Sequence, residues 1–204
     1  MQTIEDKIHK RIRGKGRAWA FSDTDFKDIA TGDTVRQSLS RLTKKGRIRR
    51  VVRGVYDYPK YSKMLKQLLS PDLNQIAQAL ARKFGWRIQP SGDTALNVLG
   101  ISTQIPNKMV YLSDGPNRIY KVGHRQIVFQ KNALKYASLK IAESALIVQA
   151  LSVLQKERID GSVIKKIRDY FEPAIRKKIL KDARVVNGWI YELIRQICSE
   201  ENRG

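Results

Sequence analysis

Groups that carry out covalent and metal chemistry are scarce in this chain of 204 residues. It has one cysteine, Cys198, and two histidines, His9 and His124. A single cysteine excludes an internal disulfide, and neither histidine has the neighbouring ligands of a zinc site. Asp93 and Asp114 each stand alone, so the paired carboxylates of a metal-dependent nuclease are missing. We therefore expect no catalytic residue, no metal and no cofactor, and we interpret the chain as a protein other than an enzyme.

Long apolar runs and acidic residues are also scarce. No stretch approaches the roughly 18 apolar residues that cross a bilayer, and the charged start of the chain lacks the apolar core of a signal peptide. These absences predict a cytoplasmic protein without a membrane partner. Nineteen acids stand against 40 lysines and arginines, which gives a net charge of +21. Such a charge attracts polyanions, and nucleic acid is the leading class of partner.

The first segment, residues 3–58, has the pattern of a compact unit. Ile4, Ile8 and Ile12 recur every four residues and predict a helix over 3–13. Residues 18–21 are typical of a short strand. Ser22 stands three residues before Asp25, a capping box that predicts a second helix with Phe26 and Ile29 facing inward.

A third helix is predicted from Asp33 to about Lys45. Val35, Leu39 and Leu42 fall on one stripe at helical spacing, which we expect to be buried. The opposite face holds Gln37, Ser40, Arg41 and Lys44. Glutamine and arginine bond base edges, and lysine and arginine neutralise phosphate. We interpret this helix as a recognition helix for the major groove.

An arginine-rich hairpin follows over residues 47–58, with two β-prone runs around a glycine turn. Four arginines within seven residues favour an exposed ribbon beside DNA, the wing of a winged helix-turn-helix. The alternative is a solubilising charge run on an ordinary hairpin. The complete set of candidate DNA-binding residues is Thr34, Arg36, Gln37, Ser40, Arg41, Lys44, Lys45, Arg47, Arg49, Arg50 and Arg53.

The remaining segment has a different pattern. Pro59 and Pro71 bracket a boundary zone, and helix is predicted after Pro71 with Leu73, Ile76, Ala77, Leu80 and Phe84 on its apolar face. Strands are predicted at 86–90, 108–112, 118–122 and 126–129, a short helix at 93–99, and helices from about 137 to the end, with stops at Gly161 and Gly188. The sequence thus predicts an α+β protein: a winged helix-turn-helix over 1–60, then over 61–204 a mixed α/β domain with a small antiparallel sheet and C-terminal helices.

Two longer strings resemble a known family. "RVVRGVYDYPK" at the end of the expected hairpin, followed by "IQPSGDTALNVLGISTQIPNKMVYLSDGPNRIYKVG", is similar to the AbiEi-type antitoxins of bacterial type IV toxin-antitoxin systems, over about residues 3–155. This resemblance implies that the N-terminal domain represses its own operon by binding inverted repeats in promoter DNA. It further implies that the second domain counteracts a co-encoded nucleotidyltransferase toxin, and it assigns no neutralising residue.

Three other functions stay open at this point. The winged helix would also serve a DNA-organising or plasmid-replication protein without an antitoxin role. An RNA-binding protein is a further alternative, although no stacking motif of aromatic residues accompanies the basic segments. The last is an enzyme that acts on nucleic acid. The identity of the neighbouring gene distinguishes an antitoxin from a DNA-organising or plasmid-replication protein, because only the antitoxin is expected beside a toxin gene.

Overall fold

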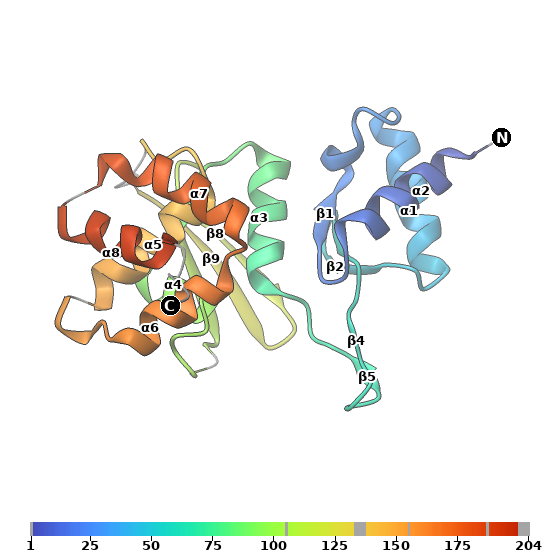
Figure 1. Ribbon diagram of the computed structural model, residues 1–204. Coiled ribbons are helices and arrows are strands. Elements are labelled where there is room, and N and C mark those ends of the chain that lie inside the picture. Colours follow the sequence, from blue (N-terminus) through green and yellow to red (C-terminus); the bar gives the residue numbers. More distant parts are fainter. Residues whose placement is uncertain (1, 105, 133–137, 155, 187, 200–204) are drawn as a thin grey trace. The chain divides into compact units, whose positions relative to one another are not determined.

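The protein is described by a computed structural model, which defines residues 2–104, 106–132, 138–154, 156–186 and 188–199 (Figure 1). Contacts between residues divide the chain into two compact units. Unit 1 comprises Met1–Arg87 with Ile119–Ile127, and unit 2 comprises Ile88–Arg118 with Val128–Gly204. The sequence predicts a domain boundary after residue 60, with each side able to fold alone. The division into units does not test which fragments fold alone, so this boundary stays a prediction.

The first elements of unit 1 follow the predicted order closely. They are α1 (Ile4–Lys15), β1 (Ala20–Ser22), the 3₁₀ turn η1 (Asp23–Phe26), α2 (Gly32–Lys44), β2 (Arg49–Val52) and β3 (Val55–Asp57). The three strands form an antiparallel sheet in the order β1-β3-β2. Thr3 caps α1 through a reciprocal capping box with Asp6.

One expected helix is much shorter than predicted. The capping box of Ser22 and Asp25 is present, but the segment that it opens is a four-residue 3₁₀ turn and not an α-helix. Only Phe26 is buried within it. Ile29, the other residue predicted to face inward, lies just after the turn and is partly buried against the same core. Only a few residues separate the end of the turn from Thr31, the N-cap of the next helix, which is too short a segment for a full α-helix.

Apolar side chains from α1, α2 and the strands close a small core. Ile8 and Ile12 meet Val35, Leu39 and Leu42 of α2, which is the stripe that the periodicity predicts. Ile4 is the exception, because it remains 37% exposed. Phe21 and Phe26 pack edge to face with ring centroids 5.6 Å apart, a favourable arrangement for aromatic rings.

A further helix packs on the outside of this sheet within unit 1. It is α3 (Leu73–Phe84), which contacts β1 and β3. Its N-cap is Asp72, whose carboxylate accepts from the amides of Asn74 and Gln75. Leu73, Ile76, Ala77 and Leu80 are buried as predicted, whereas Phe84 is 47% exposed.

The zone between Pro59 and Pro71 contains a hairpin that the sequence pattern does not predict. Its strands are β4 (Tyr61–Ser62) and β5 (Gln67–Leu68), paired antiparallel. In Figure 1 this narrow ribbon extends away from β2. We call residues 60–69 the hairpin arm.

The second sheet has four strands in the order β6-β7-β9-β8. They are β6 (Ile88–Pro90), β7 (Lys108–Ser113), β8 (Arg118–Val122) and β9 (Arg125–Lys131). The turn signal at 114–117 suggests that β7 and β8 pair, but β9 lies between them. The Asn117 carboxamide accepts from the Lys131 amide, and Asn132 donates to Ser113 O, so the ends of β7 and β9 are held together.

Helices form most of unit 2. They are α4 (Gly92–Val98), α5 (Ala142–Leu154), the 3₁₀ turn η2 (Lys156–Arg158), α6 (Gly161–Tyr170), α7 (Pro173–Asp182), the 3₁₀ turn η3 (Ala183–Val185) and α8 (Gly188–Cys198). Gly161 and Gly188 begin helices and do not end them, contrary to the prediction. Asp160 explains the first case, because its carboxylate accepts from the Val163 amide and caps α6.

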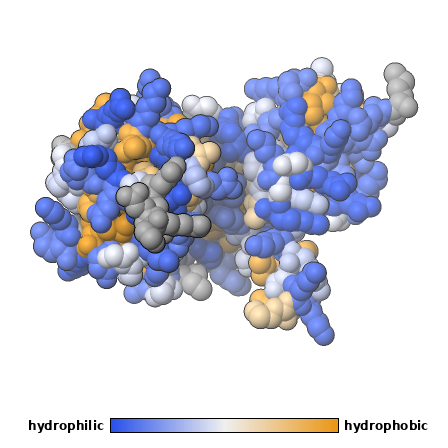
Figure 2. Space-filling model, viewed as in Figure 1, coloured by the Kyte–Doolittle hydropathy of each residue, from blue (hydrophilic) through white to orange (hydrophobic). Residues whose placement is uncertain are grey.

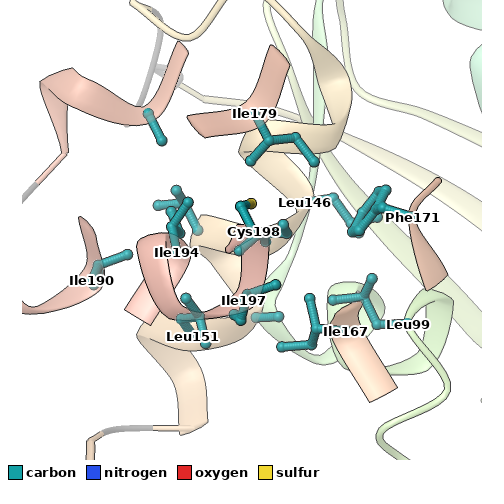
Figure 3. Packing of buried hydrophobic residues seen from close by; sticks show 14 of the residues in the cluster. Leu99, Leu146, Leu151, Ile167, Phe171, Ile179, Ile190, Ile194, Ile197 and Cys198 are labelled. Atoms are coloured by element: carbon teal, nitrogen blue, oxygen red, sulfur yellow. The ribbon is translucent and has the colours of Figure 1, made fainter. Parts of the chain in front are cut away.

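Five helices supply the core of unit 2. Figure 3 shows Leu99 beside α4, Leu146 and Leu151 of α5, Ile167 of α6, Ile179 of α7 and Ile194 of α8 converging on one apolar centre. Helix α5 is buried along Ser144–Leu151, so it is the central element. The arrangement of helices and antiparallel sheets confirms the predicted α+β class.

Candidate nucleic-acid interface

Helix α2 divides into a buried face and a charged face. Val35, Ser38, Leu39 and Leu42 are buried, and residues three or four apart on the other side lie together. This outer face carries Arg36, Gln37, Ser40, Arg41 and Lys44, all exposed. At 13 residues the helix is about 20 Å long, which suffices to lie along a major groove.

Thr34 belongs to the first turn of α2 and is half-buried. Its hydroxyl lies 3.0 Å from that of Thr31, and its carbonyl accepts from the Ser38 hydroxyl. Thr34 is therefore placed to support the start of the helix, while the exposed side chains further along carry its chemistry.

The basic hairpin follows α2 almost directly. Gly46 has a φ of 67° and Gly54 a φ of 73°, in the left-handed region that favours glycine. They place a turn at each end of β2, so Arg47, Arg50 and Arg53 all lie exposed within a few residues of the helix end. At the tip, Lys83 Nζ of α3 donates to the carbonyls of Arg53 and Gly54, 3.4 and 3.3 Å away. These contacts hold the turn in place.

Each acidic side chain of the first 60 residues forms an ion pair or caps a helix. Glu5 pairs with Lys45, Asp28 with Arg11, Asp23 and Asp33 with Arg36, and Asp57 with Arg49. Asp6 and Asp25 cap α1 and η1, and Asp25 also pairs with Arg82. None of the described residues supplies an ion-pair partner to five cations of this region: Arg41, Lys44, Arg47, Arg50 and Arg53.

These five cations are concentrated in one segment, because no acid occurs between Asp33 and Asp57. We call Gln37 together with Arg41, Lys44, Arg47, Arg50 and Arg53 the basic surface. An unneutralised cluster of this kind is costly in isolation, because like charges repel, and it attracts a polyanion.

The pKa of His9 lies below its ordinary value. Burial lowers it first, and the positive charges of Arg13 and Arg47 lower it further. Asp6 and Glu5 act in the opposite direction and do not outweigh these effects. His9 thus stays neutral near pH 7, and it contributes no charge to the basic surface.

Two of the predicted contact residues, Arg36 and Lys45, form ion pairs within the protein. Arg36 donates to Asp23 and Asp33, and these hydrogen bonds raise the pKa of its guanidinium. Lys45 Nζ lies 2.5 Å from Glu5 Oε1. Arg36 therefore joins η1 to α2, and Lys45 joins α2 to α1. Both remain exposed at the surface.

Arg49 differs most from the sequence-based interpretation. Its guanidinium makes a two-point contact with Asp57, at 3.0 Å from Nε and 2.6 Å from Nη2, and donates to Leu69 O at 3.1 Å. Asp57 is 1% exposed. Arg49 thus neutralises a buried carboxylate and anchors the hairpin arm. The signal that points to it is Asp57 itself, the only acid between residues 34 and 71, which needs a partner inside a strand.

Arg17 is a further structural residue that the sequence pattern does not indicate. Its guanidinium lies 3.9 Å from the centroid of the Tyr58 ring and donates to Pro59 O. The guanidinium thus covers one face of the Tyr58 ring. Arg17 and Arg49 together fix both ends of the hairpin arm.

Elsewhere the described residues offer little reactive chemistry. Burial raises the pKa of Cys198 to about 11, and its thiol packs in the core of unit 2 (Figure 3). Within the same ranges, no three His, Cys, Asp or Glu residues come together as metal ligands. No described helix has the length and apolar character needed to span a bilayer.

Comparison with known protein families gives one assignment. The profile of a family of unknown function, DUF6088, matches residues 3–179. The chain belongs to this family. No curated protein matches it. The match of the DUF6088 profile covers the basic surface, the four-stranded sheet and the following helices as far as residue 179 in α7, so the family extends over most of both parts.

Proposed function

We propose that this DUF6088 protein binds duplex DNA through the basic surface and represses its own promoter. In this arrangement α2 lies in the major groove with Gln37 and Arg41 toward base edges, while Arg50 and Arg53 contact the backbone or minor groove. The order of elements and the β1-β3-β2 sheet support a winged helix-turn-helix. The observation that carries the proposal is the set of five cations left without acids beside an exposed helix face.

The antitoxin role is the second part of the proposal, and it rests on the similarity to AbiEi-type antitoxins. By that similarity the partner of the second segment is a co-encoded nucleotidyltransferase toxin. The alternative is a DNA-organising or plasmid-replication protein that uses the same basic surface without a toxin beside it. The gene next to this one separates these readings.

Arg41→Ala tests whether the exposed face of α2 points toward the bases. We expect the variant to lose about 1 to 3 kcal/mol of binding free energy on the promoter fragment and much less on unrelated duplex DNA, because a base contact discriminates between sequences. Fluorescence anisotropy with both DNAs measures the difference. Arg53→Ala is the matched control on the hairpin, and it should weaken binding to both DNAs alike. An equal loss on both DNAs for Arg41→Ala would place this side chain on phosphate.

A separate test divides repression from neutralisation in the full-length chain. The triple variant Arg41→Ala, Arg50→Ala and Arg53→Ala should release a promoter reporter, because each change removes an exposed cation and leaves the core intact. It should still protect cells in which the toxin is expressed from an unrelated promoter. Loss of protection together with repression would mean that the protein acts on the toxin only by silencing its gene.

A further inference from the structure

The hairpin arm combines exposed apolar side chains with lysines. Met64 is 86% exposed, Leu65 54% and Leu68 55%. Lys60, Lys63 and Lys66 are also exposed. Figure 2 shows the apolar and hydrophilic side chains of this ribbon side by side. Large apolar groups that stay in water on a protruding ribbon indicate a surface that another molecule covers.

The arm is anchored at its base and free at its tip. Arg17 donates to Pro59 O, Arg49 donates to Leu69 O, and the Leu69 amide donates to Lys60 O at 2.8 Å. Strands β4 and β5 pair only at Tyr61–Leu68 and Ser62–Gln67. An isolated hairpin of this size is marginal in water. The contacts of Arg17 and Arg49 therefore hold the base of the arm in place, because the pairing between β4 and β5 is too short to do so alone.

The tip carries a backbone conformation that its sequence does not favour. Lys66 has a φ of 50°, where glycine or asparagine would be less strained. Lysine at this position keeps a positive charge at the turn, next to Met64 and Leu65. A lysine with a left-handed backbone is uncommon, and here it places a positive charge at the tip of the arm.

Charge decides which partner fits. Residues 58–71 contain three lysines and no acid, so the arm matches a polyanion. A second copy of the chain is a poor match, because each copy has a net charge of +21. Apolar side chains at the end of a basic ribbon are suited to insertion between base steps from the minor groove, with cations on the flanking phosphates.

We propose that the hairpin arm is a second DNA-contacting element, with Lys63 and Lys66 on backbone phosphates and Met64 and Leu65 inserted into the minor groove. This inference rests on the proposed DNA binding and extends it to a part of the duplex that α2 does not read. The base of the arm adjoins β2 through Arg49, so the arm and the basic surface belong to the same structural unit.

Two pairs of substitutions in the full-length chain separate the two kinds of contact. Lys63→Gln with Lys66→Asn removes the charges and leaves a residue that tolerates the backbone at position 66. It should reduce the slope of log K against log salt by about 2. Met64→Ser with Leu65→Ser should lower the affinity for the promoter fragment about tenfold without changing that slope, because only apolar contact is lost. All four side chains are exposed, so folding is unaffected.

The matched control is Lys165→Gln with Lys166→Gln on α6, which removes the same charge at exposed positions of unit 2. We expect it to leave the slope unchanged. A slope reduced as strongly as by the arm variant would overturn the local assignment to the arm.

A tethered cleavage agent reports the position of the tip directly. Met64→Cys is labelled with iron-EDTA, while the natural Cys198 is buried with a raised pKa and stays unlabelled. Bound to the promoter fragment, the conjugate should cut both strands with the offset of minor-groove attack. Binding without cleavage, or cleavage with the major-groove offset, would overturn the insertion.

The failure of this inference is distinguishable from failure of the proposed function. If wild-type protein does not bind the promoter fragment, the proposed function is wrong. If wild type binds but both arm variants behave like wild type, only the arm proposal is wrong. A change in sedimentation of the Met64→Ser, Leu65→Ser variant with unchanged DNA affinity would identify the arm as a contact between copies of the chain and overturn its role on DNA.

Discussion

Raising the salt concentration from about 50 to about 200 mM is expected to weaken binding to promoter DNA roughly a thousandfold. Lys44, Arg47, Arg50 and Arg53 supply four phosphate contacts in this account, and the hairpin arm adds two lysines. About six neutralised phosphates give a slope of log K against log salt near −5, because each contact releases condensed counterions. Anisotropy titrations at several salt concentrations measure the slope.

The control for this prediction is a duplex of unrelated sequence. Its salt slope should be similar, because phosphate contacts do not depend on sequence. A slope near zero on both DNAs would mean that the basic surface does not touch the backbone. The net charge of the chain would then serve another purpose, such as contact with an acidic protein.

Removing the Arg49 guanidinium is expected to destabilise the protein by about 3 kcal/mol. Arg49→Ala leaves the Asp57 carboxylate buried without its two charge-assisted hydrogen bonds, and the hydrogen bond from the guanidinium to Leu69 O is lost as well. Urea unfolding followed by circular dichroism measures the change. At a temperature where the Arg49→Ala variant is folded, its loss of DNA affinity should be smaller than the loss caused by Arg50→Ala.

Two further variants make the test specific. Arg50→Ala changes an exposed neighbour on the same strand and should alter the free energy of unfolding by at most about 0.5 kcal/mol. Arg49→Ala combined with Asp57→Ala should recover part of the loss, since the uncompensated buried charge is gone. Equal destabilisation by Arg49→Ala and Arg50→Ala would contradict the structural role of the Arg49 and Asp57 pair.

Elements with a strong apolar period are predictable from this sequence. Helix α2 is found within one residue of its expected bounds because Val35, Leu39 and Leu42 leave no other face to bury. The strands β7 and β8 are found for another reason, because two β-prone runs flank turn residues at 114–117. The 3₁₀ turn η1 is harder, because a capping box marks where a helix starts but says nothing about how far burial can sustain it.

Features that depend on pairing between distant residues are not predictable in this way. The position of β9 between β7 and β8 brings residues far apart in the sequence together, as in the hydrogen bonds from Lys131 N to Asn117 Oδ1 and from Asn132 N to Ser113 O, and no local period encodes this pairing. The hairpin arm is not predicted from the sequence because its side chains face solvent and show no alternation of burial. At the candidate site, the exposed face of α2 is predictable from helical spacing, whereas the burial of Asp57 against Arg49 requires knowledge of the strand register.

The central claim is that the basic surface reads the protein's own promoter, and a single competition titration tests it most directly. Labelled promoter fragment and unlabelled duplexes of the same length, one of promoter and one of scrambled sequence, are titrated with the full-length protein at moderate salt. The account predicts that the promoter duplex competes on the order of a thousandfold better, as sequence-specific proteins do. Equal competition by both duplexes would contradict it and leave only sequence-independent binding.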